Sequence, residues 1–325
     1  MRVLLTGATG FVGGAVVKQL LNGGEFNVVA VVRTLEKQLS LTVKQVVGEL
    51  QLDNDWLDSL DGIDVIVHAA ARAHIMNDSA VDPLAEFRSV NVDGTLNLAR
   101  QAAKAGVKRF VFISSIKVNG EMTDFEHPFT PDDDYNYIPI DPYGLSKYEA
   151  EQDLLELAKN MEMEVVIIRP PLVYGPSVKA NFASMMKWMN KGVPLPFGAI
   201  HNKRSLVALD NLGSFITHCA DYKKTPQAAN HIFLISDGED VSTTELLQKV
   251  AKAFGKKSLL LPIPVNLMTL AAKMLGKGDV ANRLFGSLQV DSSKARELLG
   301  WKPVITMDEQ LKKTADAYLA HEKTL

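Results

Sequence analysis

The chain has 325 residues, 46% of them hydrophobic, which is enough for a buried core in two domains or in one large fold with an insertion. Its formal net charge of −3 gives no reason to expect nucleic acid or an anionic membrane surface as a partner. The single cysteine, Cys219, excludes an internal disulfide framework and predicts a reducing, cytoplasmic location. No apolar stretch approaches the ~20 residues of a spanning helix, so we expect no membrane insertion.

The chain opens with a predicted buried strand at residues 2–6, followed by a glycine-rich turn and a helix. Gly7 allows a sharp turn, Gly10 lets backbone amides approach a pyrophosphate, and Gly13 permits close packing of helix on strand. The helix N-terminus would face the phosphates, so we predict a dinucleotide site here. A glycine-rich turn without a ligand is the alternative. The predicted contacts are Gly7, Thr9, Gly10, Phe11 and Val12.

The second predicted strand, residues 27–32, ends at Arg33. An acidic residue at this tip would accept hydrogen bonds from both ribose hydroxyls and would repel a 2′-phosphate. No acid stands at the tip, and the Arg33 guanidinium suits a phosphate. The tip therefore favours NADP(H), with NAD(H) as the second option and a solvated arginine as the alternative without a ligand.

A third predicted strand, residues 43–47, leads to a turn expected to contact adenine through Glu49 and Leu50. Residues 64–68 read as a buried strand, and the small residues after it would let a cofactor lie close: Ala69, Ala70 and Ala71. His74 follows without partner ligands at metal spacing. We therefore predict no metal site, and a loop or substrate-pocket role for His74.

Residues 87–105 predict one long helix, in which Gly94 costs ~1 kcal/mol relative to alanine and therefore indicates close packing.

A strand at residues 109–113 ends in Ser114 and Ser115. Because the site of an open parallel sheet lies beyond the carboxyl ends of its strands, we expect Ser115 beside a substrate hydroxyl. Capping of a turn is the alternative. Residues 119–142 predict a long loop, either a lid or a solvated acidic loop.

A helix predicted from residue 142 to about 161 carries Tyr143 and Lys147 in its first turns. Residues four apart share one helix face. A lysine ammonium beside a phenol favours the phenolate, so we expect a lowered pKa for Tyr143 and general acid–base chemistry. The spacing alone is weak, and a tyrosine at the start of a surface helix is the alternative.

A strand at residues 164–168 continues the alternation of strand and helix, which predicts an α/β fold: a doubly wound parallel sheet of the Rossmann type with helices on both faces. The alternation ends after Pro176. We predict a dinucleotide-binding domain of residues 1–176, to which residues 206–236 return. A smaller, mostly helical substrate domain would comprise residues 177–205 and 237–325.

Taken together, these residues resemble the extended short-chain dehydrogenase/reductase superfamily, in its nucleotide-sugar epimerase/dehydratase branch. The resemblance covers nearly the whole chain. The motifs that carry it are Thr6–Gly13, Asn91-x-x-Gly94-Thr95, Ser114-Ser115, Tyr143-x-x-x-Lys147, Arg169-Pro170 with Tyr174-Gly175-Pro176, and Asp291-Ser-Ser-Lys-Ala295 with Leu299-Gly-Trp301.

The resemblance implies that Tyr143 moves a proton at a sugar hydroxyl or ketone, while hydride passes between nicotinamide C4 and hexose C4. Lys147 would bind the nicotinamide ribose and keep Tyr143 acidic. Ser115 would hydrogen-bond the reacting oxygen, and Asn91 would support Lys147 through water. The resemblance adds Pro170 to the cofactor contacts.

The implied partner is a UDP-linked sugar, and the resemblance is compatible with a homodimer. Relatives hold the nucleotide with an amide on the diphosphate, a ring against the base and a guanidinium on phosphate. The residues at the matching positions are Asn181, Phe197 and Arg204. Lys117 and the less clearly aligned Arg283 complete the predicted substrate contacts.

Three departures bear on the reaction. Ile116 and Lys117 stand where related 4,6-dehydratases carry Asp-Glu, which argues against dehydration. Arg33 and Leu172 differ from the acid and the asparagine common in 4-epimerases. The pattern looks most like bacterial UDP-4-keto-sugar reductases, so we expect reduction of a 4-keto-6-deoxy-hexosamine. A UDP-hexose 4-epimerase acting on UDP-glucose or UDP-N-acetylglucosamine is the alternative.

Two other classes share this frame. One is an enzyme on a hydrophobic ketone, against which Asn181 and Arg204 argue because an apolar substrate needs no phosphate contacts. The other is a protein that binds cofactor without turnover. Relatives of that kind usually lose the tyrosine or the lysine, whereas Tyr143, Lys147 and Ser115 are all present.

Overall fold

The structure, a computed structural model, describes residues 1–36, 39, 42–73, 82–124, 127–132, 137–276 and 278–322. His74 and most of the acidic run near residue 133 lie outside the described residues. Among the residues that are described, we find no helix with the length and apolar character needed to span a bilayer.

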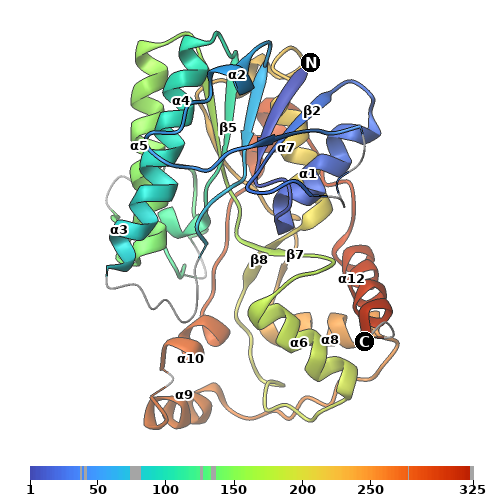
Figure 1. The fold of residues 1–325 in the computed structure, drawn as a ribbon. Helices are drawn as coiled ribbons and strands as arrows, with labels where there is room; N and C mark the ends of the chain where they lie inside the picture. Colours follow the sequence, from blue (N-terminus) through green and yellow to red (C-terminus); the bar gives the residue numbers. More distant parts are fainter. Residues whose placement is uncertain are drawn as a thin grey trace.

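A parallel sheet forms the centre of the larger part of the molecule (Figure 1). In the described residues it has seven strands, in the order β3 (Lys44–Val47), β2 (Asn27–Val32), β1 (Arg2–Thr6), β4 (Val65–His68), β5 (Arg109–Ile113), β6 (Glu164–Arg169) and β9 (Ile232–Leu234). The central strands are buried on both faces, as their unbroken apolar runs require. The predicted doubly wound Rossmann fold is therefore confirmed.

Two hydrophobic cores lie on opposite faces of this sheet. One core holds α1 (Phe11–Asn22), α7 (Leu209–Ala220) and α11 (Ser293–Leu299) against the sheet. The other holds α2 (Leu57–Leu60), α4 (Thr95–Lys104) and α5 (Pro142–Asn160). Figure 1 shows α4 and α5 on one side of the strands and α1 on the other. Each helix thus buries an apolar face against one side of the sheet.

A smaller part lies at one end of the sheet and contains a second sheet that we did not predict. Its strands, in spatial order, are β10 (Asp240–Val241), β8 (Arg204–Ala208) and β7 (Leu172–Tyr174). The helices of this part are α6 (Ala180–Lys191), α8 (Thr243–Ala253), α9 (Val265–Met274), α10 (Gly278–Phe285) and α12 (Met307–Glu322). Short single-turn helices, η2 (Ile116–Val118) and η3 (Pro226–Ala228), connect elements of the chain.

Two features bear on how the chain divides. The strand β9 pairs in parallel with β6 of the large sheet, and α7 lies in the same core as α1. The residue boundaries of the two domains stay a prediction.

The single helix predicted for residues 87–105 is wrong in detail. The chain forms α3 (Pro83–Arg88), then a π-helical turn, η1 (Ser89–Gly94), and then α4. At Gly94 a Cβ atom would lie 2.6 Å from the carbonyl carbon of Leu50. The close packing expected at this glycine is therefore present, and the wider turn brings Asn91 to the interior.

Candidate active site

The glycine-rich turn after β1 approaches the chain at the end of β4. Gly7 has a φ of +73°, and a Cβ atom on it would lie 2.7 Å from the backbone nitrogen of Ala70. A Cβ atom on Gly13 would lie 2.0 Å from the carbonyl oxygen of Gly7. Both positions therefore exclude a side chain. The half-buried residues Ala69, Ala70 and Ala71 line this approach.

The start of α1 fits a dinucleotide pyrophosphate. Gly10 is the N-cap of α1, and no side chain of the described residues caps this helix. Thr9 and Gly10 are exposed, and Phe11 and Val12 are half-buried. The first-turn amides of a helix lack intrahelical partners, and here they stand at an exposed glycine turn where phosphate oxygens can accept from them. These residues fit the cofactor that the sequence predicts.

The predicted adenosine contacts lie on the loops that follow β2 and β3. Arg33 is exposed directly after β2. Glu49 is exposed and accepts a hydrogen bond from Gln51 at 2.8 Å, and Leu50 packs its backbone against Gly94. The Asn97 amide of α4 donates to the carbonyl oxygens of this loop. The loop is thus fixed by α4 and the π-helical turn.

A buried histidine beneath this site escaped the sequence analysis. His68 Nδ1 lies 2.9 Å from the Thr6 hydroxyl, and its Nε2 lies 3.0 Å from the Thr95 hydroxyl. Burial, with a contribution from the charge of Lys147, lowers the pKa of His68 to about 3. The ring therefore stays neutral and links β1, β4 and α4. A histidine inside an apolar strand was the available signal.

Lys147 is buried beneath the end of β5. Its Nζ donates a 2.8 Å hydrogen bond to the carbonyl oxygen of Ile113 and lies 4.4 Å from the centroid of the Phe112 ring. Burial lowers the pKa of Lys147 to about 7, partly opposed by the carboxylate of Glu151. The ammonium is thus held by the sheet and is readily deprotonated for a lysine.

Tyr143 is half-buried, with its ring 6.0 Å from that of Phe87 in an edge-to-face arrangement. Burial, and next the carboxylate of Asp141, raise the pKa of Tyr143 to about 12. The lowered pKa that we expected is wrong for the protein alone. The physical reason is that burial disfavours the phenolate and that the nearby charge is the anion of Asp141, while Lys147 donates to Ile113.

Ser115 and Lys117 lie in the turn that follows β5. The Ser115 hydroxyl accepts from the backbone nitrogen of Lys117 at 3.3 Å, so it also caps a turn, as the alternative proposed. Lys117 Nζ lies 3.1 Å from the carboxylate of Asp141 and 5.9 Å from the centroid of the Tyr143 ring. It also lies 3.7 Å from Glu121. Lys117 is therefore a cation beside the tyrosine.

Asn91 is buried and contacts two segments of the site. Its side-chain amide donates to the carbonyl oxygen of Arg72 at 3.1 Å and to the Ser146 hydroxyl at 3.0 Å, while its oxygen accepts from the Arg72 nitrogen. Ser146 in turn donates to the carbonyl oxygen of Tyr143. Asn91 thus joins the loop after β4 to the first turns of α5. Its support of Lys147 through water stays a prediction.

A buried ion pair holds α5 against the end of β6. Arg169 Nε donates to Glu151 Oε1 at 3.0 Å, and both side chains are fully buried. Next to Arg169, the buried Pro170 accepts at its carbonyl oxygen from the backbone nitrogen of Ile116 at 3.0 Å. Neither Glu151 nor Asp141 was predicted as a site residue, although an acid four residues after Lys147 was a usable signal.

The predicted nucleotide contacts lie in the smaller part. Arg204, on β8, donates from its guanidinium to the carbonyl oxygens of Arg283 and Gly286 at 2.8 and 3.0 Å. Arg204 and Arg283 are therefore neighbours, and the Arg283 side chain is exposed. Asn181 is exposed in the first turn of α6, and Phe197 is half-buried and packs with the core of this part.

The chain before α6 is strained, which the sequence did not reveal. Ser177 and Ala180, neither of them glycine, have φ angles of 68° and 55°. Non-glycine residues in this region cost of the order of 1 kcal/mol and tend to cluster at ligand sites. The strain immediately precedes Asn181, which is consistent with a contact segment there.

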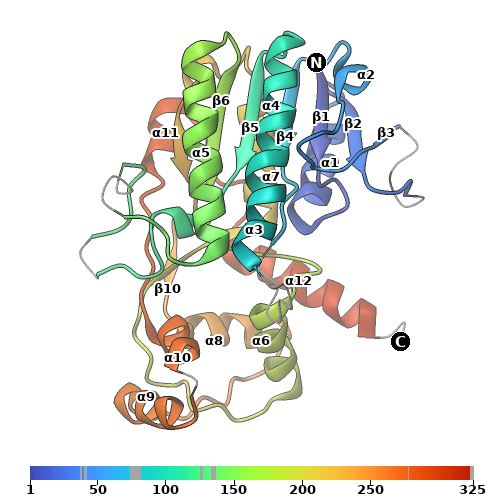
Figure 2. The same cartoon turned by 60° about the vertical axis from the view of Figure 1, so that its left-hand side comes forward.

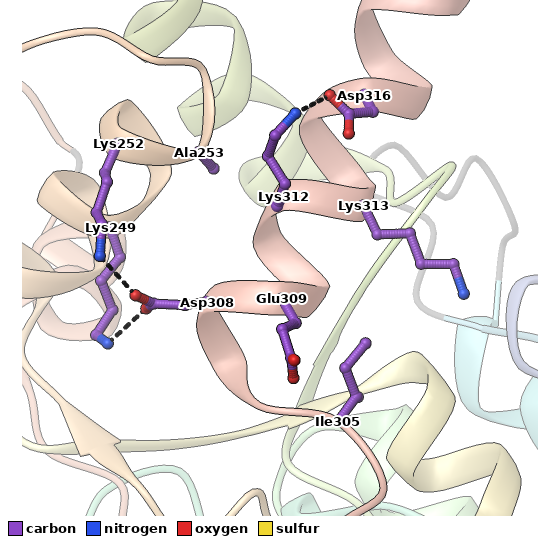
Figure 3. Close-up of a pocket in the computed structure, with 9 residues that line it drawn as sticks. All are labelled: Lys249, Lys252, Ala253, Ile305, Asp308, Glu309, Lys312, Lys313 and Asp316. Atoms are coloured by element: carbon purple, nitrogen blue, oxygen red, sulfur yellow. Dashed lines mark hydrogen bonds and ion pairs between the residues drawn. The ribbon is translucent and has the colours of Figure 1, made fainter.

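A hollow of about 630 Å³ lies elsewhere, between α8 and α12 (Figure 3). Several of its charged side chains pair with one another, as Asp308 does with Lys249 and Lys252 at 2.8 Å each. The hollow is lined by none of the predicted site residues. Among the described residues we also find no cluster of side chains that could hold a metal ion.

Comparison with known proteins identifies the family and supports the fold. Residues 3–234 match the model of the NAD dependent epimerase/dehydratase family. The UDP-glucose 4-epimerase of Vibrio cholerae is 51% identical over 98% of this chain and 95% of its own length. The UDP-glucose 4-epimerase of Thermotoga maritima, solved with UDP-glucose, has a TM-score of 0.76 at 24% identity, covering 99% of this chain and 100% of its own. The UDP-N-acetylglucosamine 4-epimerase of Bacillus cereus has a TM-score of 0.77 at 20% identity, with 99% of each chain covered.

Proposed function

The chain belongs to the NAD dependent epimerase/dehydratase family, and from this premise we propose that it is a UDP-hexose 4-epimerase. It is an enzyme of the nucleotide-sugar type built on the short-chain dehydrogenase frame. The observation that carries the proposal is the 51% identity to a UDP-glucose 4-epimerase over nearly the whole of both chains. The comparisons support this reaction, our alternative from the sequence, better than the 4-keto-sugar reduction that we expected first.

The residues at the end of β5 and the start of α5 are suited to proton transfer at O4 of the sugar. Tyr143 would take the O4 proton and return it, and Ser115 would hydrogen-bond the same oxygen. With a pKa of about 12 the free phenol is protonated at neutral pH, so it needs a nearby cation to act as a base. Lys117, whose ammonium lies 5.9 Å from the centroid of the Tyr143 ring, is the cation beside the phenol in this structure.

The glycine turn, the start of α1, Ala69 to Ala71, Lys147 and Pro170 would hold the dinucleotide. A nicotinamide held by these residues would supply the acceptor and donor of the hydride at C4 of the sugar. We propose NADP(H) as the preferred form on the strength of Arg33, although the family is described as NAD dependent. The preference for NADP(H) rests on this residue alone.

The smaller part would hold the UDP group. Arg204 is half-buried, and burial lowers the pKa of its guanidinium, so an anionic diphosphate would compensate a partly desolvated cation. Asn181 and the exposed Arg283 would add polar contacts, and Phe197 a surface for the base. Lys117, beside Tyr143, would contact the sugar or its diphosphate.

Two assays distinguish the epimerase from the reductase. In the first, the purified protein receives UDP-glucose, and separately UDP-N-acetylglucosamine, with no added cofactor. In the second, it receives NADPH and UDP-4-keto-6-deoxy-N-acetylglucosamine. We expect 4-epimers in the first assay and no steady loss of NADPH absorbance in the second. Steady NADPH consumption without any epimer would overturn the proposal in favour of reduction.

Tyr143→Phe is the matched control for the chemistry, because it removes only the hydroxyl. General acid–base catalysis is worth ~10²- to 10⁴-fold, so turnover should fall by about that factor while dinucleotide affinity stays near that of the wild type. A variant within a few-fold of wild-type turnover would remove Tyr143 from the proposed role.

A further inference from the structure

The helix α9 exposes an apolar stripe to solvent. Leu267, Leu270 and Met274 recur at the three- and four-residue spacing of one helix face, and they are 59%, 58% and 81% exposed. Leu275 directly after the helix is also exposed. All ten residues of α9 are described, and none of them is buried. An amphipathic helix usually turns such a face to the core, so a face that points outward indicates an interaction surface.

The charges around this stripe are of one sign. Residues 254–278, which begin after α8 and include α9, contain four lysines and no aspartate or glutamate. Lys256, Lys257 and Lys273 are exposed on this segment. The whole-chain net charge of −3 hides this separation, because the acidic residues lie elsewhere in the sequence. An apolar stripe flanked by lysines without acids complements an anionic apolar surface.

The position of α9 leaves the stripe accessible. Both views place α9 at the end of the smaller part that lies farthest from the large parallel sheet (Figures 1 and 2). The next helix, α10, contacts α9 and carries Arg283, whose carbonyl oxygen accepts from Arg204. This end therefore adjoins the proposed nucleotide contacts without including them.

We propose that α9 docks the protein on the surface of an anionic lipid bilayer. The ten-residue helix lies in the plane of the interface, with Leu267, Leu270 and Met274 entering the headgroup and acyl boundary. Lys257 and Lys273 contact the acidic headgroups. A second copy of this chain suits the face less well, because two such segments would bring their lysines together with no acid inside either segment to pair them. The helix is far too short to span the bilayer.

The test is co-sedimentation of the full-length protein with vesicles. Vesicles of phosphatidylethanolamine and phosphatidylglycerol are compared with vesicles of phosphatidylcholine alone, at low and high salt. We expect binding to the anionic vesicles that weakens as salt is raised. The variant pair Leu267→Gln with Leu270→Gln should reduce binding by about tenfold while the epimerase assay is unchanged.

Leu57→Gln is the matched control, since Leu57 is also 59% exposed but lies on α2 in the larger part. It should leave vesicle binding at the wild-type level. An equal loss with Leu57→Gln, or wild-type binding that ignores lipid charge, would overturn the proposal. So would a protein that ignores vesicles but forms a dimer which the Leu267 and Leu270 variant dissociates in sedimentation velocity, because a second copy would then cover the face.

Discussion

The ammonium of Lys147 donates a 2.8 Å hydrogen bond to the carbonyl oxygen of Ile113, the last residue of β5. A second link, the ion pair of Lys117 with Asp141, joins the turn after β5 to the N-cap of α5. These two links fix the first turns of α5 at the carboxyl end of the sheet. The position of Tyr143 is therefore set by fixed elements, and its pKa is set first by burial and next by the carboxylate of Asp141.

Opposite changes in pH dependence are expected from the two partners in that ion pair. Lys117→Met leaves the Asp141 carboxylate uncompensated and should raise the pKa of Tyr143 further. Asp141→Asn removes the carboxylate and should lower that pKa, while its amide oxygen still accepts from the Gly144 nitrogen. The pH at which kcat/KM rises should therefore increase by about one unit in Lys117→Met and decrease by about one unit in Asp141→Asn.

Lys117→Arg keeps the charge and is the control for this pair. Its kcat/KM should rise at a pH near that of the wild type. A loss of substrate contact alone would raise KM without changing the pH at which kcat/KM rises. If both variants changed that pH in the same direction, the electrostatic account of Tyr143 would be wrong.

Neighbouring glycines in α1 should respond differently to alanine. A Cβ atom on Gly13 would lie 2.0 Å from the carbonyl oxygen of Gly7, whereas one on Gly14 would meet its nearest atom at 3.6 Å. Gly13→Ala should displace the turn, cost ~1–3 kcal/mol in the free energy of unfolding and weaken dinucleotide binding at least about tenfold. Gly14→Ala should be neutral or stabilising by up to ~1 kcal/mol. Urea unfolding and cofactor titration measure both, and equal effects of the two variants would contradict the proposed turn geometry.

Acid should destabilise the protein through His68. Its pKa is about 3 in the fold and 6.5 in the unfolded chain, so between these values the unfolded state binds a proton that the folded state does not. The free energy of unfolding should therefore fall as pH drops from about 6.5 towards 3, by an amount of the order of 4 kcal/mol from this group. In His68→Gln, which cannot take up that proton, urea unfolding should show a shallower pH dependence over the same range. Parallel curves for variant and wild type would exclude His68 as the source.

Arg33 should decide the cofactor preference. A charge-assisted contact is worth ~1.5–3 kcal/mol, so Arg33→Ala should weaken NADP(H) binding about ten- to a hundredfold and leave NAD(H) binding unchanged. Lys18→Ala, which removes an exposed cation from α1, is the control for net charge. Titration at fixed salt measures all three proteins. Equal or tighter binding of NADH by the wild type would contradict the preference.

The elements that the sequence predicted best are those buried on both sides. The strands β2 and β5 begin and end at the residues expected, because an apolar run bounded by polar residues has no other stable arrangement in such a sheet. The π-helical turn at Asn91 was missed, because a widened turn leaves the hydrophobic period almost unchanged. The strands β7 and β10 are too short to carry a period of two.

The chemistry was predicted less well than the positions. The spacing of Tyr143 and Lys147 correctly put both residues on α5, but the hydrogen bond of Lys147 to Ile113 and the approach of Asp141 are tertiary contacts that spacing does not encode. Arg33 and Leu172 argued from single positions against an epimerase. Identity of 51% to a UDP-glucose 4-epimerase over 98% of the chain outweighs two such differences.

The central claim is that hydride leaves C4 of a UDP-hexose and returns to the same carbon. The direct measurement uses UDP-glucose deuterated at C4, incubated with the protein without added cofactor, followed by NMR of the product. The account predicts UDP-galactose that retains the deuterium at C4, and no product from Tyr143→Phe on the same timescale. Product without deuterium at C4, or no epimer from the wild-type protein with this sugar or with UDP-N-acetylglucosamine, would contradict it.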